Sequence, residues 1–158
     1  MFNIGDKIVY PMHGAGVIEA IEEKEILGET HKYYILKMPI GDMKVMIPLE
    51  NVEKIGLREV IKKNEIIDVL TVLKGKKSKM SSNWNKRYRA NMEKIKSGDI
   101  YEVAEVVRNL MLRDKEKGLS TGERKMLQNA KQILISELIL VQNIDEAEAE
   151  NMINSIFN

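Results

Sequence analysis

Residues 32–49 read KYYILKMPIGDMKVMIPL, two apolar runs joined by a short polar turn. β-branched and aromatic residues fill Lys32–Met38 and Lys44–Leu49, and the Gly41-Asp42 pair between them is typical of a β-turn. The same pattern continues toward the N-terminus in two further runs, Lys7–Pro11 and Val17–Ile26. Four or five short strands with no helix between them predict a small antiparallel barrel or a strongly bent sheet.

After Leu57 the apolar spacing changes from every second residue to about every 3.6 residues, which predicts helices for the rest of the chain. Cap residues mark the expected helix starts: Asn64, Ser82 or Asn83, Asp99, Ser120 and Asp145. The last three are each followed three residues later by a glutamate, as in a capping box. We therefore expect an α+β protein, with a β domain at residues 1–56 and an all-helical domain of about five helices at residues 57–158.

Composition excludes several classes of site. The 158 residues are 44% hydrophobic and 31% charged, as in soluble globular proteins. With no cysteine and two histidines, the chain lacks the ligands of most metal sites. It has no glycine-rich phosphate loop before a lysine, and no nucleophile with a plausible base nearby. We expect no enzyme activity, catalytic residue, metal or cofactor.

The N-terminus carries Asp6 and Lys7 where a secretory signal needs an apolar core. No apolar run approaches the roughly 18 residues of a membrane span. We therefore expect a cytoplasmic protein with neither a membrane nor a small molecule as its partner.

Positive charge is concentrated in one segment, Lys74–Lys96, which holds nine Lys or Arg and one acid. Its local charge of +8 contrasts with +1 for the whole chain, and residues 1–58 carry −2. Such a segment is typical of a surface that contacts a phosphate backbone. The stretch Lys74–Lys79 also fits a solvated loop, and the composition alone does not separate the two interpretations.

Trp84, the only tryptophan, begins a predicted helix within this segment. On that helix Trp84, Tyr88, Met92 and Ile95 share one stripe, so all four could pack into the helical core. The cations at Lys86, Arg87 and Arg89 favour a different interpretation, in which the indole stays at the surface and presses against stacked bases.

Five segments carry a resemblance to a known family: VYPMHGAGVI at 9–18, GLREVI at 56–61, NWNKRYRAN at 83–91, KSGD at 96–99 with VAEVVR at 103–108, and LSTGERKML at 119–127. In this order and spacing they resemble the CarD/CdnL family of bacterial transcription regulators. The resemblance covers essentially the whole chain.

For the β domain, the resemblance implies a Tudor-like module, similar to that of the transcription-repair coupling factor, that docks on the β subunit of RNA polymerase. In the family one strand adds to a strand of the β subunit. The matching positions here are Lys24, Met43, Lys44, Val45, Met46 and Ile47. Some relatives use a basic residue where this chain has Met46, so the contact there is expected to be apolar.

For the helical domain, the resemblance implies binding to promoter DNA at the upstream edge of the melted region, without sequence preference. Trp84 would wedge into the minor groove, and the expected phosphate contacts are Lys86, Arg87 and Arg89, with Lys79, Arg124 and Lys125 as further candidates. The result would be a more stable open promoter complex, and association with the nucleoid through RNA polymerase. In the alternative, the protein is a polymerase-binding adaptor whose helical domain meets another protein.

Overall fold

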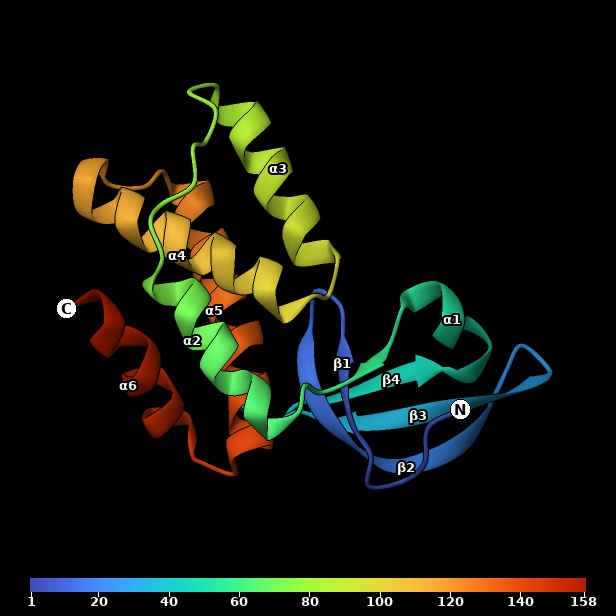
Figure 1. Cartoon of the computed structure of the whole chain (residues 1–158). Helices are drawn as coiled ribbons and strands as arrows, with labels where there is room; N and C mark the ends of the chain where they lie inside the picture. Colours follow the sequence, from blue (N-terminus) through green and yellow to red (C-terminus); the bar gives the residue numbers. More distant parts are fainter.

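Five antiparallel strands form the N-terminal part of the protein, and the computed structural model describes them together with the rest of the 158 residues (Figure 1). Their order in the sheet is β4-β3-β2-β1-β5, so β4 and β5 are the edge strands. Their bounds are β1 Lys7–Tyr10, β2 Gly14–Ile26, β3 Glu29–Lys37, β4 Lys44–Pro48 and β5 Arg58–Glu59.

The four predicted strands are present, and β5 is an addition that only its pairing with β1 defines. It has two residues, too few for a periodic pattern in the sequence. A 3-10 turn, Leu49–Asn51, and the short helix α1, Val52–Ile55, connect β4 to β5. The sheet thus continues past residue 56, where we placed the end of the β domain.

Alternating residues of the strands close a small core on one face of the sheet, formed by Ile8, Ile18, Tyr34, Leu36, Met38 and Ile47. Gly16 lets β2 approach β3 at this core. A β-carbon there would lie 2.7 Å from the Leu36 side chain and 2.8 Å from the Lys37 carbonyl oxygen. A register shift between Ile18 and Ala20 then bends β2, because a bulge increases the local twist of a strand.

Five helices follow, which confirms the predicted α+β organisation: α2 Ile66–Lys74, α3 Trp84–Lys96, α4 Ile100–Lys117, α5 Thr121–Gln142 and α6 Glu146–Phe157. The caps Asn83, Asp99, Ser120 and Asp145 each accept a backbone N–H of the first turn. Asn64 does not cap α2, because it lies within a 3-10 turn, Lys63–Glu65. Among the predicted capping boxes, only Asp145 with Glu148 is complete.

The helices surround one apolar core in which α4 and α5 pack along their length. Buried side chains from α4, α5 and α6 meet there, among them Val106, Leu110, Leu134, Leu138 and Ile153. Burying one such side chain contributes about 1.5–3 kcal/mol. No helix of the protein has the length and apolar character needed to cross a membrane.

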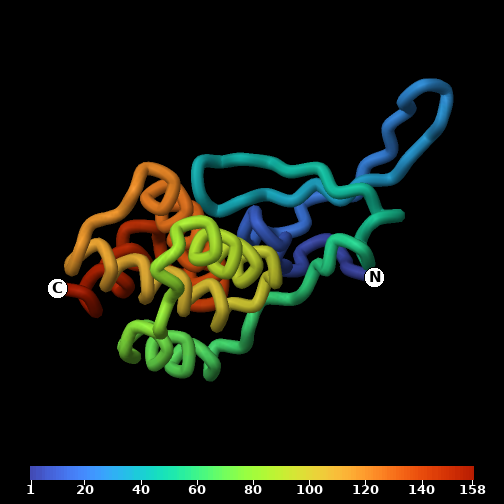
Figure 2. Tube along the Cα trace, turned by 90° about the horizontal axis from the view of Figure 1, so that it is seen from above, coloured from blue at the N-terminus to red at the C-terminus, as the bar shows by residue number.

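The sheet packs against α5 through polar contacts as well as apolar ones. Ser136 Oγ accepts the Ala15 N–H at 2.8 Å, and Gly14 is required beside it because a β-carbon would lie 2.7 Å from the same oxygen. Glu137, buried on α5, accepts both terminal nitrogens of Arg58 at 2.7 and 2.8 Å. Breaking a buried, hydrogen-bonded ion pair is costly, so these contacts fix the orientation of the two parts. In Figure 2 the helices and the sheet lie at opposite ends of the molecule.

Candidate nucleic-acid interface

The basic segment forms the connection from α2 to α3 and then α3 itself. Its loop is fastened to α4: Asn109 Oδ1 accepts the Ser78 N–H at 3.0 Å, and the Ser78 hydroxyl donates to Glu105 at 3.0 Å. Lys94 donates to the same carboxylate at 2.8 Å, and this hydrogen bond is the main reason that the pKa of Glu105 lies below its ordinary value. The loop is therefore an ordered part of the surface, with Lys79 exposed on it.

The stripe predicted on α3 passes from the core to the surface along the helix. Ile95 is buried, Met92 and Tyr88 are partly buried, and Trp84 is 41% exposed. The interpretation that all four side chains lie in the core is therefore wrong at the tryptophan. The indole stacks on Tyr88, with 4.9 Å between the ring centroids and 20° between the planes. An aromatic side chain with one covered and one open face is suited to stacking against a base or sugar.

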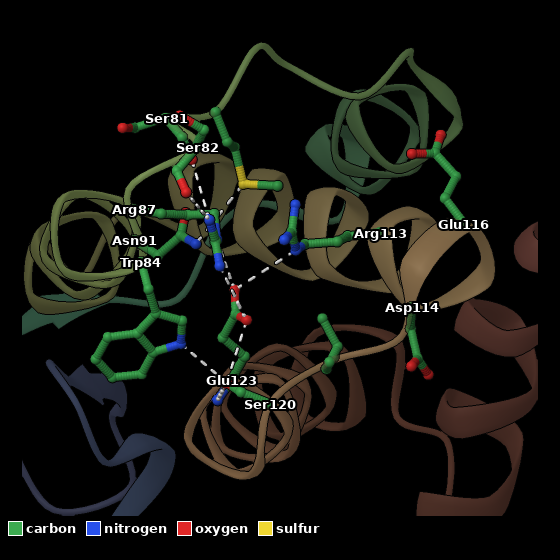
Figure 3. Close-up of polar contacts among 12 residues, drawn as sticks. Ser81, Ser82, Trp84, Arg87, Asn91, Arg113, Asp114, Glu116, Ser120 and Glu123 are labelled. Atoms are coloured by element: carbon green, nitrogen blue, oxygen red, sulfur yellow. Dashed lines mark hydrogen bonds and ion pairs between the residues drawn. The ribbon is translucent and has the colours of Figure 1, made fainter.

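The first turn of α5 holds the nitrogen-bearing edge of the indole (Figure 3). Trp84 Nε1 donates to Ser120 Oγ at 2.9 Å, so the N-cap of α5 also anchors the tryptophan. Gly122 provides the space, because a β-carbon there would lie 3.2 Å from the indole ring. The orientation of the exposed ring is thus set by two helices that are distant in sequence.

A buried ion pair lies directly behind Trp84. Arg87 donates to the Glu123 carboxylate through Nε at 2.8 Å and through Nη2 at 3.3 Å, and the two side chains are 4% and 3% exposed. Arg87 Nη1 also donates to the Ser81 carbonyl at 3.0 Å. Figure 3 shows this guanidinium turned inward, toward α5. Arg87, which we expected to contact phosphate, instead joins α3 to α5 and to the preceding loop.

Two opposing effects act on the Glu123 carboxyl group. Burial raises its pKa, but the hydrogen bonds and charge of Arg87 outweigh burial, and the pKa lies below its ordinary value. Arg113 Nε, 3.9 Å from the carboxylate, acts in the same direction. Ser120 donates its hydroxyl proton to Glu123 at 3.2 Å. One chain of polar contacts therefore runs from the indole through Ser120 to a charged, buried glutamate.

The remaining candidate cations lie on exposed faces of the two helices that hold the indole. Lys86 and Arg89 are exposed on α3. Arg124 and Lys125 are exposed on the first two turns of α5, and Lys125 is three residues from Gly122, so it lies on the same side of that helix. Apart from Arg124, which lies 4.0 Å from an Asp114 oxygen, none of these has an ion-pair partner. The exposed faces of α3 and α5 therefore carry positive charge that can meet an anion.

The candidate polymerase contacts gather on the edge strand β4 and on β2. Met43 and Met46 are exposed, and Lys24 is exposed on β2. Lys44 Nζ lies 2.9 Å from Glu19, whose hydrogen bond raises the pKa of the lysine. Ile47 is fully buried in the core of the sheet. Its side chain is therefore not available to a partner, and the strand contact expected along Met43–Ile47 stays a prediction that concerns the backbone at this position.

Two family models match separate parts of the chain. The model described as "CarD, C-terminal domain" matches residues 68–154, more than half of the chain, and the one described as "CarD-like/TRCF RID domain" matches residues 2–61. The chain belongs to the CarD family. The second match includes β5, in agreement with a sheet that extends past residue 56.

A curated relative that matches nearly the whole chain agrees with this assignment. The chain is 46% identical over 151 residues to a protein of Bacillus subtilis (strain 168) described as "Putative transcription factor YdeB", covering 96% of this chain and 99% of that protein. Among solved structures, the N-terminal domain of Myxococcus xanthus CarD is 30% identical over 37% of this chain and 79% of that chain, with a TM-score of 0.33.

Proposed function

We propose that this CarD-family protein binds RNA polymerase through its N-terminal sheet and stabilises open promoter complexes by inserting Trp84 into the DNA minor groove. The observation that carries the proposal is the state of Trp84: the indole is 41% exposed and held in one orientation by Ser120 and Tyr88, and exposed cations lie on the same two helices. Apolar side chains that insert between base steps favour bent and unstacked DNA.

The polymerase partner is supported by the RID domain match at residues 2–61, because a CarD-like/TRCF RID domain implies an interaction with RNA polymerase. Strand β4 has a partner on one side only, so its open edge can accept a strand of the polymerase β subunit. The exposed Met43 and Met46 would add apolar contact beside that edge.

The mechanism requires no chemical step. A protein that binds melted DNA more tightly than closed duplex shifts the equilibrium by the difference in affinity. A difference of about 1.4 kcal/mol changes the population of open complexes about tenfold. The cations around Trp84 would contact phosphates, which position a protein on DNA without reading its sequence. Placement upstream of the melted region would then come from the polymerase.

The experiment is to measure the lifetime of open complexes on a promoter that melts poorly, using the cognate polymerase with and without the protein. We expect the wild type to lengthen the lifetime and Trp84→Ala to lose most of the effect while still binding polymerase. A control variant, Met46→Glu, should lose polymerase affinity instead, because it places a charge at the open edge of β4. Equal lifetimes with wild type and Trp84→Ala would contradict the wedge and favour an adaptor that meets another protein.

A further inference from the structure

Strands β2 and β3 continue past the sheet core as a two-stranded hairpin. Residues 21–30 are all exposed, and the end of this hairpin stands away from the rest of the molecule in Figure 2. Ile26 pairs with Glu29 at its last rung, so Leu27 and Gly28 form a two-residue turn.

The turn has an unusual residue in its first position. Leu27 has φ 52° and Gly28 has φ 80°, and two central residues with positive φ are typical of a type I′ turn, where Asn-Gly is strongly preferred. A branched L-residue is sterically disfavoured in this left-handed region. The Leu27 side chain is also 99% exposed, so no packing within the chain compensates. Such a feature points to a contact with another molecule.

The surroundings of Leu27 specify the chemistry of that molecule. Ile26 beside it is also exposed, so the tip presents two adjacent apolar side chains. The exposed residues 21–30 contain four glutamates and one lysine, a formal charge of −3, and one of these glutamates, Glu23, lies 3.9 Å from Lys32. A nucleic acid would be repelled by this charge, whereas a protein surface with an apolar pocket and basic residues around it would be attracted.

We propose that the β2–β3 hairpin is a second docking point for RNA polymerase, with Leu27 inserted into an apolar pocket that basic residues surround. The identity of the partner rests on the function proposed above. Lys24, a candidate polymerase contact, is on the same hairpin three residues before Leu27, and β4 belongs to the same sheet. Two contacts on one sheet would fix the orientation of the protein on the polymerase, which a single strand edge leaves free to pivot.

The test is Leu27→Asn, which separates folding from binding. Because Asn-Gly is the preferred type I′ pair, the variant should unfold at the same or a higher Tm than the wild type. Its affinity for the cognate core RNA polymerase should nevertheless fall about tenfold, as for loss of an interface anchor. Ile67→Gln is the matched control, since Ile67 is an exposed apolar residue on α2, away from the sheet. It should bind polymerase as the wild type does.

The outcomes separate this proposal from the one on which it rests. If Leu27→Asn binds polymerase as tightly as the wild type while Met46→Glu binds weakly, docking through β4 stands and the hairpin contact is refuted. If the wild-type protein itself does not bind polymerase, both proposals are wrong. An equal loss of affinity for Ile67→Gln would show a nonspecific apolar effect and would also refute the hairpin contact.

Discussion

The indole nitrogen of Trp84 lies 2.9 Å from the hydroxyl oxygen of Ser120, 36 residues further along the chain. The first residue of α3 is thus held in place by the N-cap residue of α5. A side chain already held in its binding orientation loses less conformational entropy when it meets its target. Ser120 therefore acts on the proposed wedge as a positioning residue.

Ser120→Ala should weaken the protein in two ways. Loss of the N-cap of α5 should lower the free energy of unfolding by about 1 kcal/mol. Loss of the acceptor should free the indole, shift the emission of this single tryptophan, and shorten open-complex lifetimes toward those of Trp84→Ala. Ser120→Thr keeps the hydroxyl, so its free energy of unfolding, tryptophan emission and open-complex lifetime should return to the wild-type values.

Asp145, the N-cap of α6, provides a control that should lower stability without changing the position of Trp84. Asp145→Ala removes the N-cap of α6, which has no contact with Trp84, and should cost a similar free energy of unfolding. Its tryptophan emission and its open-complex lifetime should match the wild type. If Asp145→Ala shortens the lifetime as much as Ser120→Ala does, the hydrogen bond to the indole has no separate role.

Arg87 and Lys86 are neighbours in sequence, but we expect them to contribute very differently to the free energy of unfolding. Arg87→Met leaves Glu123 charged, buried and without its main partner, and should lower the free energy of unfolding by about 3–5 kcal/mol. Lys86→Met alters an exposed side chain and should change the free energy of unfolding by no more than about 0.5 kcal/mol. Urea unfolding of the two variants measures both values. Similar small losses would mean that the ion pair contributes little to the fold.

Features that depend on neighbouring residues can be predicted from this sequence, whereas the contact of Arg87 with a distant residue cannot. The strands, most helix ends and the stripe on α3 follow from local periodicity and cap residues, which act within a few positions. The phosphate contact expected of Arg87 follows from the resemblance and from its place in the basic segment, whereas its partner, Glu123, is 36 residues away and gives no local signal. The S-x-x-E pattern at Ser120 was interpreted as a capping box, but the glutamate turns to Arg87 instead.

The burial of Ile47 follows from a rule that applies to any strand sequence. In a strand, side chains alternate between faces, so Val45 and Ile47 share one face while Lys44 and Met46 share the other. The structure follows this rule, with Ile47 buried and Met46 exposed. The anchoring of Trp84 by Ser120 and Gly122 carried no comparable local signal, because it depends on how α3 crosses α5.

DNA affinity should depend on salt through the exposed cations. Each phosphate contact contributes close to one unit to the slope of log K against log salt. Lys86→Ala and Arg89→Ala should therefore each lower the slope by about 1, whereas Trp84→Ala should lower affinity and leave the slope unchanged. Titrations of a short duplex at several salt concentrations give these slopes. If the slopes of Lys86→Ala and Arg89→Ala both equal the wild-type slope, these side chains do not contact phosphate.

Acid should destabilise the protein through Glu123. Its pKa is lower in the folded protein than the ordinary value near 4.5 expected for the unfolded chain. As the pH falls, the unfolded chain therefore takes up a proton first. The stabilisation that the ionised carboxylate provides above pH 4.5 is then lost progressively below that pH. Glu123→Gln should therefore be less stable at neutral pH and lose less stability on acidification. Glu105, whose pKa is also lowered, keeps part of the acid sensitivity in the variant.

Urea midpoints measured between about pH 3 and pH 7 test this prediction for Glu123→Gln. Glu150→Gln, at an exposed site on α6, should follow the wild-type curve, and an unchanged acid dependence in Glu123→Gln would show that the buried pair does not control it.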